Sequence, residues 1–300
     1  MIVVRLEGGL GNQMFQYAFG WSLARRWGTR LWLDLSSYAA RPAHGFLLDR
    51  FCIDASALPP TETWRLPHRY RGVAPRGLGK LRCWWPAGRL KRWREKPFGF
   101  RDKHLAAPDD SYLVGYWQSS RYFEAVADEV ASQFTLRRPL SPASQQVARR
   151  MRKCRSVAVH VRRGDYLSDP EAARLYARTP LQYFSSAIEH FASTASGPVE
   201  VFVFSNDIPW CRTHLKWPWT THWVDHNSAD SAEEDLVLMA QADACAITNS
   251  TFSWWAGWLA ERRGGRVYAP SQWFQPGTLD ASHIVPAHWI RPLEINRKAA

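Results

Sequence analysis

The chain has 300 residues, of which 46% are hydrophobic and 22% charged, which is typical of a globular protein of about two domains and excludes a disordered or fibrous class. Its formal net charge of +12 predicts an anionic partner, such as a nucleotide-linked substrate, nucleic acid or an anionic membrane surface. No apolar run is long enough to span a bilayer and the first residues lack a signal-peptide pattern, so we expect a cytoplasmic protein.

The N-terminal region predicts a βαβ unit: a strand at residues 2–6, a glycine-rich turn at 7–13, a helix at 14–27 and a strand at 31–35. Glycines such as Gly11 let the backbone approach a ligand at the start of a helix, but Met14 stands where a dinucleotide-binding fingerprint has its third glycine. Asn12 and Gln13 either cap the helix or hold polar side chains over the end of the first strand, where a ligand could bind.

Residues from about 64 to 103 interrupt this pattern. Arginines and lysines alternate there with Trp84, Trp85 and Trp93, and prolines and glycines break the periodicity. We expect an inserted region with short helices on one face of a domain. It contacts an anionic membrane or a lipid-linked acceptor, binds nucleic acid, or is simply a solvated basic surface.

The hydrophobic pattern restarts after residues 137–142, where two prolines disfavour a helix. We therefore predict an N-terminal domain of residues 1–140 and a C-terminal domain of residues 141–300. Strands alternate with helices in the second domain, which predicts a parallel sheet with helices on both faces. The expected strands are 157–161, 199–204, 221–225, 244–247 and 266–269, after a strand and its exit loop at 112–119 in the first domain.

The strand at 157–161 runs into a charged turn that carries His160, Arg162 and Arg163. Ligands of open α/β folds bind at the carboxyl ends of parallel strands, and arginine offers a fork of donors that matches phosphate oxygens. The pair therefore predicts an anion site, unless Asp165 only forms a salt bridge with it in a solvated turn.

Two further loops should end at the same edge of this sheet. The loop after residues 199–204 carries Asn206 and Asp207. The loop after residues 244–247 opens a helix, where free backbone amides and hydroxyl groups can bind phosphate. Its polar residues are Asn249, Ser250, Thr251 and Ser253. A helix cap explains one hydroxyl group but not the whole run.

Four segments stand out as a set: GGLGNQMFQY at residues 8–17, HVRRGDY at 160–166, FSND at 204–207 and NSTFSWW at 249–255. Their sequence, order and spacing resemble those of bacterial α-1,2-fucosyltransferases of glycosyltransferase family 11. The resemblance covers nearly the whole chain, apart from the basic insert.

The resemblance implies a GT-B fold, in which two Rossmann-like α/β domains with parallel sheets face a cleft. It implies GDP-β-L-fucose as the donor, inversion at the anomeric carbon, and neither a metal ion nor another cofactor. The acceptor is then a galactose-terminated oligosaccharide or lipid-linked glycan, such as an O-antigen precursor, on the side of the N-terminal domain. Peripheral contact with the inner face of the membrane fits this interpretation, and a nucleic-acid partner does not.

Residue roles carried over from the resemblance define a donor site. Arg162 or Arg163 should contact the β-phosphate, and Asn12 should reach the phosphate or the fucose from the other domain. His160 and Asp235 should face the guanosine, since a carboxylate suits the N1 and N2 donors of guanine. The remaining candidates are Gly11, Asn206, Asp207, Asn249, Ser250, Thr251 and Ser253.

The expected chemistry agrees with this site. Glycosyl transfer passes through an oxocarbenium-like transition state, and fixed cations stabilise the charge that the leaving diphosphate gains. The general base stays open between Glu7, Asp165, Asp207 and a phosphate oxygen of the donor. The alternatives are a related GT-B transferase with another sugar nucleotide, and a basic protein that binds nucleic acid or lipid.

Overall fold

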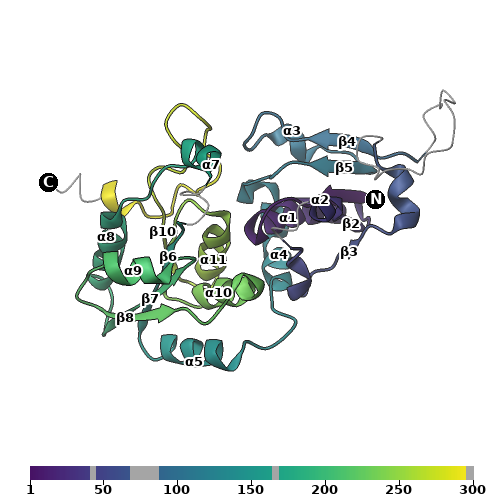
Figure 1. Cartoon of the computed structure of the whole chain (residues 1–300). Helices are drawn as coiled ribbons and strands as arrows, with labels where there is room; N and C mark the ends of the chain where they lie inside the picture. Colours follow the sequence, from purple (N-terminus) through teal and green to yellow (C-terminus); the bar gives the residue numbers. More distant parts are fainter. Residues whose placement is uncertain (41–44, 68–87, 164–168, 295–300) are drawn as a thin grey trace. The chain divides into compact units, whose positions relative to one another are not determined.

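The computed structural model describes residues 1–40, 45–67, 88–163 and 169–294 of the chain (Figure 1). The chain divides into two compact units, Met1–Thr135 (unit 1) and Leu136–Ala300 (unit 2). The sequence placed the boundary slightly later, at residue 140. Each unit contains its own parallel sheet, as the predicted α/β fold class requires.

Unit 1 is built on a five-stranded sheet in the order β3-β2-β1-β5-β4, in which all neighbouring strands run parallel. Its strands are β1 (Ile2–Arg5), β2 (Leu31–Asp34), β3 (Ser56–Ala57), β4 (Lys91–Arg94) and β5 (Ser111–Val114). Its helices are α1 (Leu10–Trp27), α2 (Ser36–Ala40), α3 (Asp102–Leu105) and α4 (Ala127–Gln133), with 3-10 turns η1 (Leu48–Arg50), η2 (Pro60–Arg65), η4 (Ser120–Tyr122) and η5 (Glu124–Val126). The β-branched residues Ile2, Val3 and Val4 are fully buried, which explains the central place of β1.

Two expectations for unit 1 are wrong. Helix α1 begins at Leu10 rather than at Met14, because Gly9 is its N-cap and the turn that the sequence predicted is already its first helical turn. Part of the basic insert is a strand and not a short helix, since Lys91–Arg94 pairs with β5 as the edge strand of the sheet. Residues 68–87 of the insert lie outside the described residues.

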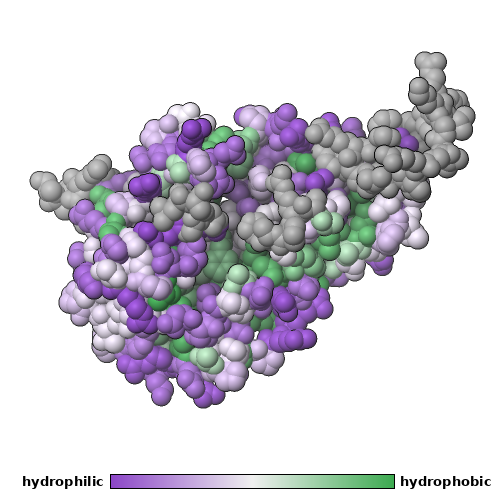
Figure 2. All heavy atoms as spheres, in the orientation of Figure 1, coloured by the Kyte–Doolittle hydropathy of each residue, from purple (hydrophilic) through white to green (hydrophobic). Residues whose placement is uncertain are grey.

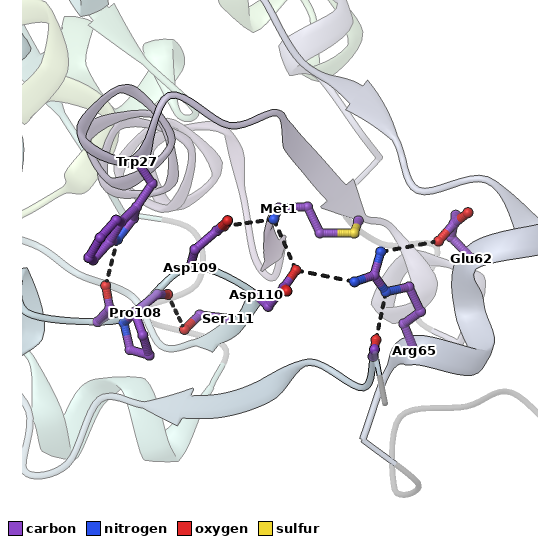
Figure 3. A network of polar contacts seen from close by, with 10 residues as sticks. Met1, Trp27, Glu62, Arg65, Pro108, Asp109, Asp110 and Ser111 are labelled. Carbon is purple, nitrogen blue, oxygen red and sulfur yellow. Dashed lines mark hydrogen bonds and ion pairs between the residues drawn. The ribbon is translucent and has the colours of Figure 1, made fainter. Parts of the chain in front are cut away.

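The amino ends of the strands of unit 1 are joined by a polar network (Figure 3). The N-terminal ammonium of Met1 contacts Asp109 at 2.7 Å and Asp110 at 3.0 Å, and Asp110 also accepts a hydrogen bond of 3.1 Å from Arg65. On the other side, the indole of Trp27 donates to the carbonyl of Ala107. These contacts fix the start of β1 relative to β5, α1 and η2, at the end of the sheet opposite its carboxyl edge.

Unit 2 repeats the architecture with the sheet order β10-β9-β6-β7-β8, again parallel throughout. The strands are β6 (Arg155–Val161), β7 (Val199–Ser205), β8 (Thr220–Val224), β9 (Ala244–Ala246) and β10 (Arg266–Tyr268). The helices are α5 (Pro142–Met151), α7 (Pro170–Leu175), α8 (Leu181–Ala192), α9 (Ile208–His214), α10 (Ala232–Met239) and α11 (Thr251–Glu261), with the 3-10 turn η6 (Ala229–Ser231). The predicted strands of this half are thus confirmed to within a few residues.

The central strand β6 lies between β7 and β9, and alternate residues such as Val157 and Val159 enter a core formed with α8 and α9. Helices α10 and α11 cover the opposite face (Figure 1). Pro142 begins α5 instead of preventing it, because its missing N–H is not needed at the first helical position and Ser141 caps the helix. This corrects the expectation that both prolines of the linker oppose a helix.

No helix among the described residues is both long and apolar enough to cross a membrane. In keeping with this, hydrophilic residues cover much of the face drawn in Figure 2.

Candidate active site

The carboxyl end of β6 places Arg162 beside the start of α11. Its Nη1 donates a 3.3 Å hydrogen bond to the Oγ of Ser250, the N-cap residue of that helix. The hydroxyl of Ser250 makes no capping bond, so the alternative of a simple helix cap is wrong for this residue. A guanidinium group beside the positive end of a helix dipole is unfavourable by itself, and an anion between them removes the conflict.

Arg163 is held quite differently. Its Nε contacts Oδ2 of Asp207 at 3.2 Å, its guanidinium carbon lies 3.6 Å from the ring centre of Trp210, and its backbone N–H donates to Asn206. The other carboxylate oxygen of Asp207 caps α9 through the N–H of Trp210. Arg163, Asn206 and Asp207 therefore join the ends of β6 and β7 next to Arg162.

His160 is an uncharged member of the same edge. It is 8% exposed, its Nδ1 lies 3.1 Å from Oγ1 of Thr248, and its ring centre is 5.5 Å from that of Phe252. Burial, together with the charge of Arg162, lowers the pKa of His160 to about 3. The imidazole is therefore neutral near pH 7 and can hydrogen-bond a ligand without adding charge.

The other polar residues of the loop before α11 mainly hold the loop itself. The amide nitrogen of Asn249 donates to the carbonyls of Ala177 and Trp273, and the hydroxyl of Ser253 donates to the carbonyls of Thr248 and Ser250. The predicted hydroxyl donor Ser253 is thus turned back on its own backbone. Thr251, the first residue of α11, is partly exposed.

Asp235 lies in the first turns of α10 and not in direct contact with His160. Its Oδ1 accepts a 2.7 Å hydrogen bond from Asn227. Burial raises the pKa of Asp235 to about 6, although the hydrogen bond from Asn227 acts in the opposite direction. A buried carboxylate whose pKa is close to neutral pH is suited to accept hydrogen bonds from the N–H groups of a ligand.

At the carboxyl edge of unit 1, Asn12 does not cap α1, since Gly9 is the N-cap. Its Oδ1 instead accepts a 2.9 Å hydrogen bond from the Nε2 of Gln118, which follows β5. Gln13 is buried and bonds the backbone of the neighbouring loops, and Gly11 is buried within the helix rather than exposed in a turn. Of the three residues predicted to bind a ligand here, Gly11 and Gln13 are buried and Asn12 keeps a partly exposed polar side chain.

The candidates for the general base are also placed. Glu7 pairs with Arg5 at 2.5 Å, and Asp207 contacts Arg163 and caps α9. Asp165 lies outside the residues that the structure describes. Sequence reasoning missed Thr248, Phe252, Trp210 and Gln118. Thr248 precedes the polar run of the predicted helix start and Phe252 lies within it, which was a signal for them, whereas Trp210 and Gln118 could be found only from the fold.

Comparisons with known proteins identify the family. The model of glycosyl transferase family 11 matches residues 1–290. The chain belongs to glycosyl transferase family 11. The predicted membership is thus confirmed, and the protein is a glycosyltransferase.

The chain is 31% identical over 296 residues to an alpha-1,2-colitosyltransferase of Escherichia coli, covering 97% of this chain and 98% of that protein. It is 30% identical over 271 residues to galactoside alpha-(1,2)-fucosyltransferase 1 of Saimiri sciureus, covering 87% of this chain but 65% of the longer relative. Both family relatives carry an alpha-1,2 linkage in their names.

Among solved structures, a mutant of Arabidopsis thaliana FUT1 in complex with GDP superimposes with a TM-score of 0.51. It is 15% identical and covers 95% of this chain and 74% of that chain. This similarity bears on the fold alone. Together with the two parallel sheets, it confirms the predicted GT-B fold class.

Proposed function

We propose that this glycosyltransferase transfers L-fucose from GDP-β-L-fucose to the 2-hydroxyl group of a terminal galactose, with inversion at the anomeric carbon. The observation that carries the proposal is the placement of Arg162 beside the N-terminus of α11 in a member of family 11. The alpha-1,2 linkage and the galactoside in the names of the relatives support the linkage and the acceptor class.

In this proposal Arg162 and the first amides of α11 bind the diphosphate of the donor. As the glycosidic bond breaks, the diphosphate gains negative charge, and a fixed guanidinium stabilises that charge more in the transition state than in the ground state. Arg163 acts by joining the ends of β6 and β7, because its guanidinium is engaged with Asp207 and Trp210. We propose that no metal ion is needed, since Arg162 and the helix dipole supply the positive charge.

The guanosine end of the donor is assigned to His160 and Asp235. The neutral imidazole can hydrogen-bond the nucleoside, and the carboxylate of Asp235 can accept from N1 and N2 of guanine. Adenine and uracil do not present this pair of donors. GDP should therefore raise the melting temperature of the protein more than ADP or UDP at equal concentration, and equal shifts would contradict the assignment.

The identity of the transferred sugar has one specific alternative. The relative at 31% identity is named a colitosyltransferase, and colitose is L-fucose without its 3-hydroxyl group. A site that hydrogen-bonds this hydroxyl rejects the deoxy sugar by about 10⁴-fold, whereas a site lined by apolar groups discriminates weakly. Comparing kcat/KM for GDP-fucose and GDP-colitose on one acceptor decides between the two donors.

We also propose a cytoplasmic enzyme that touches the inner face of the membrane peripherally, where a lipid-linked acceptor such as an O-antigen precursor is presented. At the start of the basic insert, Trp64 is 47% exposed and the guanidinium of Arg65 lies 6.0 Å from its ring. Exposed tryptophan with basic residues favours an anionic lipid surface. Cosedimentation with phosphatidylglycerol vesicles but not with phosphatidylcholine vesicles is the expected result, and equal partition would contradict the contact.

The direct test of function is incubation with GDP-fucose and lactose in the presence of EDTA. We expect release of GDP and an α-linked fucose on the 2-hydroxyl of galactose, which NMR of the product identifies. A β-linked product would contradict inversion, and inhibition by EDTA that Mg²⁺ reverses would contradict metal independence. Absence of transfer to every galactoside tried would contradict the proposed function.

A further inference from the structure

The turn that follows β5 in unit 1 is an unusually constrained segment. Trp117 has a φ of +56°, a left-handed conformation that is costly for a residue other than glycine. Its side chain is fully buried, with its ring 4.5 Å from that of Phe19 and 5.0 Å from that of His104. Strain of this kind persists only where contacts with the surrounding structure hold the residue in its conformation.

Glu95 enforces the turn from the end of β4. Its Oε2 accepts hydrogen bonds from the backbone N–H groups of Tyr116 at 2.7 Å and of Trp117 at 3.0 Å. A Cβ at Gly115 would come within 2.5 Å of the Cβ of Glu95, so glycine is required at this position for the close approach. Burial raises the pKa of Glu95, and these hydrogen bonds act against that cost.

The consequence of the turn is the direction of the next residue. Gln118, 7% exposed, points its Nε2 at Oδ1 of Asn12. An asparagine side chain has nearly the same shape in its two amide orientations, so the partner of one end decides which chemistry the other end offers. With Oδ1 engaged, the Nδ2 of Asn12 lies next to Gly8, where a Cβ would come within 2.6 Å of it. Within the described residues, Nδ2 donates to no acceptor.

We propose that Gln118 is a positioning residue that keeps Asn12 in the orientation in which its NH₂ group faces the donor substrate, and that Glu95 acts on Asn12 through the turn that directs Gln118. The inference rests on the proposed function and on the role that the resemblance implies for Asn12, which is contact with an oxygen atom of the phosphate or the fucose. The reverse orientation presents the carbonyl oxygen of Asn12 to these electron-rich oxygens and opposes binding.

A double-mutant cycle tests whether Gln118 acts through Asn12. Asn12→Ala and Gln118→Ala should each lower kcat/KM for fucosyl transfer by about 10- to 100-fold, the order of loss that follows a small displacement in an active site. The double variant should be no slower than Asn12→Ala alone, because the same interaction is lost. Gln133→Ala is the matched control: it removes another partly buried glutamine of unit 1, which bonds the N–H of Asp54, and should leave kcat/KM unchanged.

Two conservative variants separate orientation from packing. Gln118→Glu keeps the size but can only accept, so it draws Nδ2 of Asn12 toward itself and should lose at least as much activity as Gln118→Ala. Glu95→Gln retains an oxygen that accepts from both backbone amides and should keep most of the activity that Glu95→Ala loses. Melting temperatures identify any variant that fails to fold, and only folded variants enter the comparison.

The outcomes also distinguish a failure of the proposed function from a failure of the role inferred for Gln118. Wild-type protein that transfers no sugar from GDP-fucose contradicts the proposed function. If the wild type is active and the folded Gln118→Ala and Gln118→Glu variants have the same kcat/KM as the wild type, the inference alone is contradicted. Losses that multiply in the double variant also overturn it, because they place Gln118 and Asn12 in separate roles.

Discussion

The carboxyl edges of the two parallel sheets carry different chemistry on the same architecture. In unit 2 the edge presents Arg162 beside a helix N-terminus. In unit 1 the corresponding edge presents the neutral amides of Asn12 and Gln118, and its arginine, Arg5, is paired with Glu7. One βαβ framework can therefore carry either a charged or an uncharged polar edge.

The largest effect should come from removing the charge in unit 2. Arg162→Ala should lower kcat by about 10²- to 10³-fold, equivalent to about 3–4 kcal/mol, as when one donor to a developing oxyanion is lost. Arg162→Lys should recover part of the rate, because lysine retains the charge but not the planar fork. Steady-state GDP release measures both. An Arg162→Ala enzyme with wild-type kcat would remove the contrast between the two edges.

The second effect concerns pH and the guanosine end of the site. If guanine binds the ionised carboxylate of Asp235, affinity for GDP should fall below the pKa of about 6, by roughly tenfold for each pH unit. Calorimetric titration with GDP between pH 5 and 8 measures this dependence, and Asp235→Asn should weaken binding at pH 8 and flatten the profile. A flat profile in the wild type would exclude this role.

The same group gives a prediction of opposite sign for stability. Its pKa in the folded protein lies above that of an unfolded chain, so the folded state binds the proton more tightly. The stabilising contribution is therefore present below about pH 4 and is lost as the pH rises through about 6. In the absence of ligand, the Asp235→Asn variant should therefore have a higher melting temperature than wild type at pH 7. At pH 4 the two melting temperatures should be similar.

A smaller effect is expected at Arg163. Its contacts with Trp210 and Asp207 join the ends of β6 and β7, so Arg163→Ala should cost about 1 kcal/mol of stability and lower kcat less than Arg162→Ala does. Thermal unfolding and GDP release provide the two measurements. If Arg163→Ala is the more damaging of the two in kcat, the roles assigned to the two arginines are reversed.

The smallest effect is expected for Ser250→Ala. Its hydroxyl accepts a single 3.3 Å hydrogen bond from Arg162, and the guanidinium charge and the helix amides remain without it. A loss of only a few-fold in kcat/KM fits a contribution of about 1 kcal/mol for such a bond. A loss as large as that of Arg162→Ala would show that the hydroxyl itself is indispensable.

Much of unit 2 could be predicted because local pattern and burial agree there. β6, β7 and β9 are short apolar strands, and each ends in polar residues that parallel pairing brings to one edge. The strand β4 could not be predicted, because its sequence, Lys91 to Arg94, is basic and takes its conformation from pairing with β5 at the edge of the sheet. Tertiary pairing overrides local propensity in such a strand.

Within the site, residue types were easier to predict than the direction of their side chains. Ser253 and Asn249 were predicted to bind a ligand, but in the fold their side chains donate to backbone carbonyls. The sequence alone does not reveal which acceptor such a side chain takes. Glu95 was not selected, because its role depends on the approach of β4 to a turn about twenty residues later in the chain. Arg162 and Arg163 are adjacent in sequence, yet only the fold shows which arginine lies beside α11 and which one pairs with Asp207 after β7.

A crystal structure of the protein with GDP tests the central claim most directly. We predict that the β-phosphate lies within hydrogen-bond distance, about 3 Å, of the guanidinium of Arg162 and of the first amides of α11. Arg163 should remain against Trp210. A diphosphate bound away from both Arg162 and α11 would contradict the account.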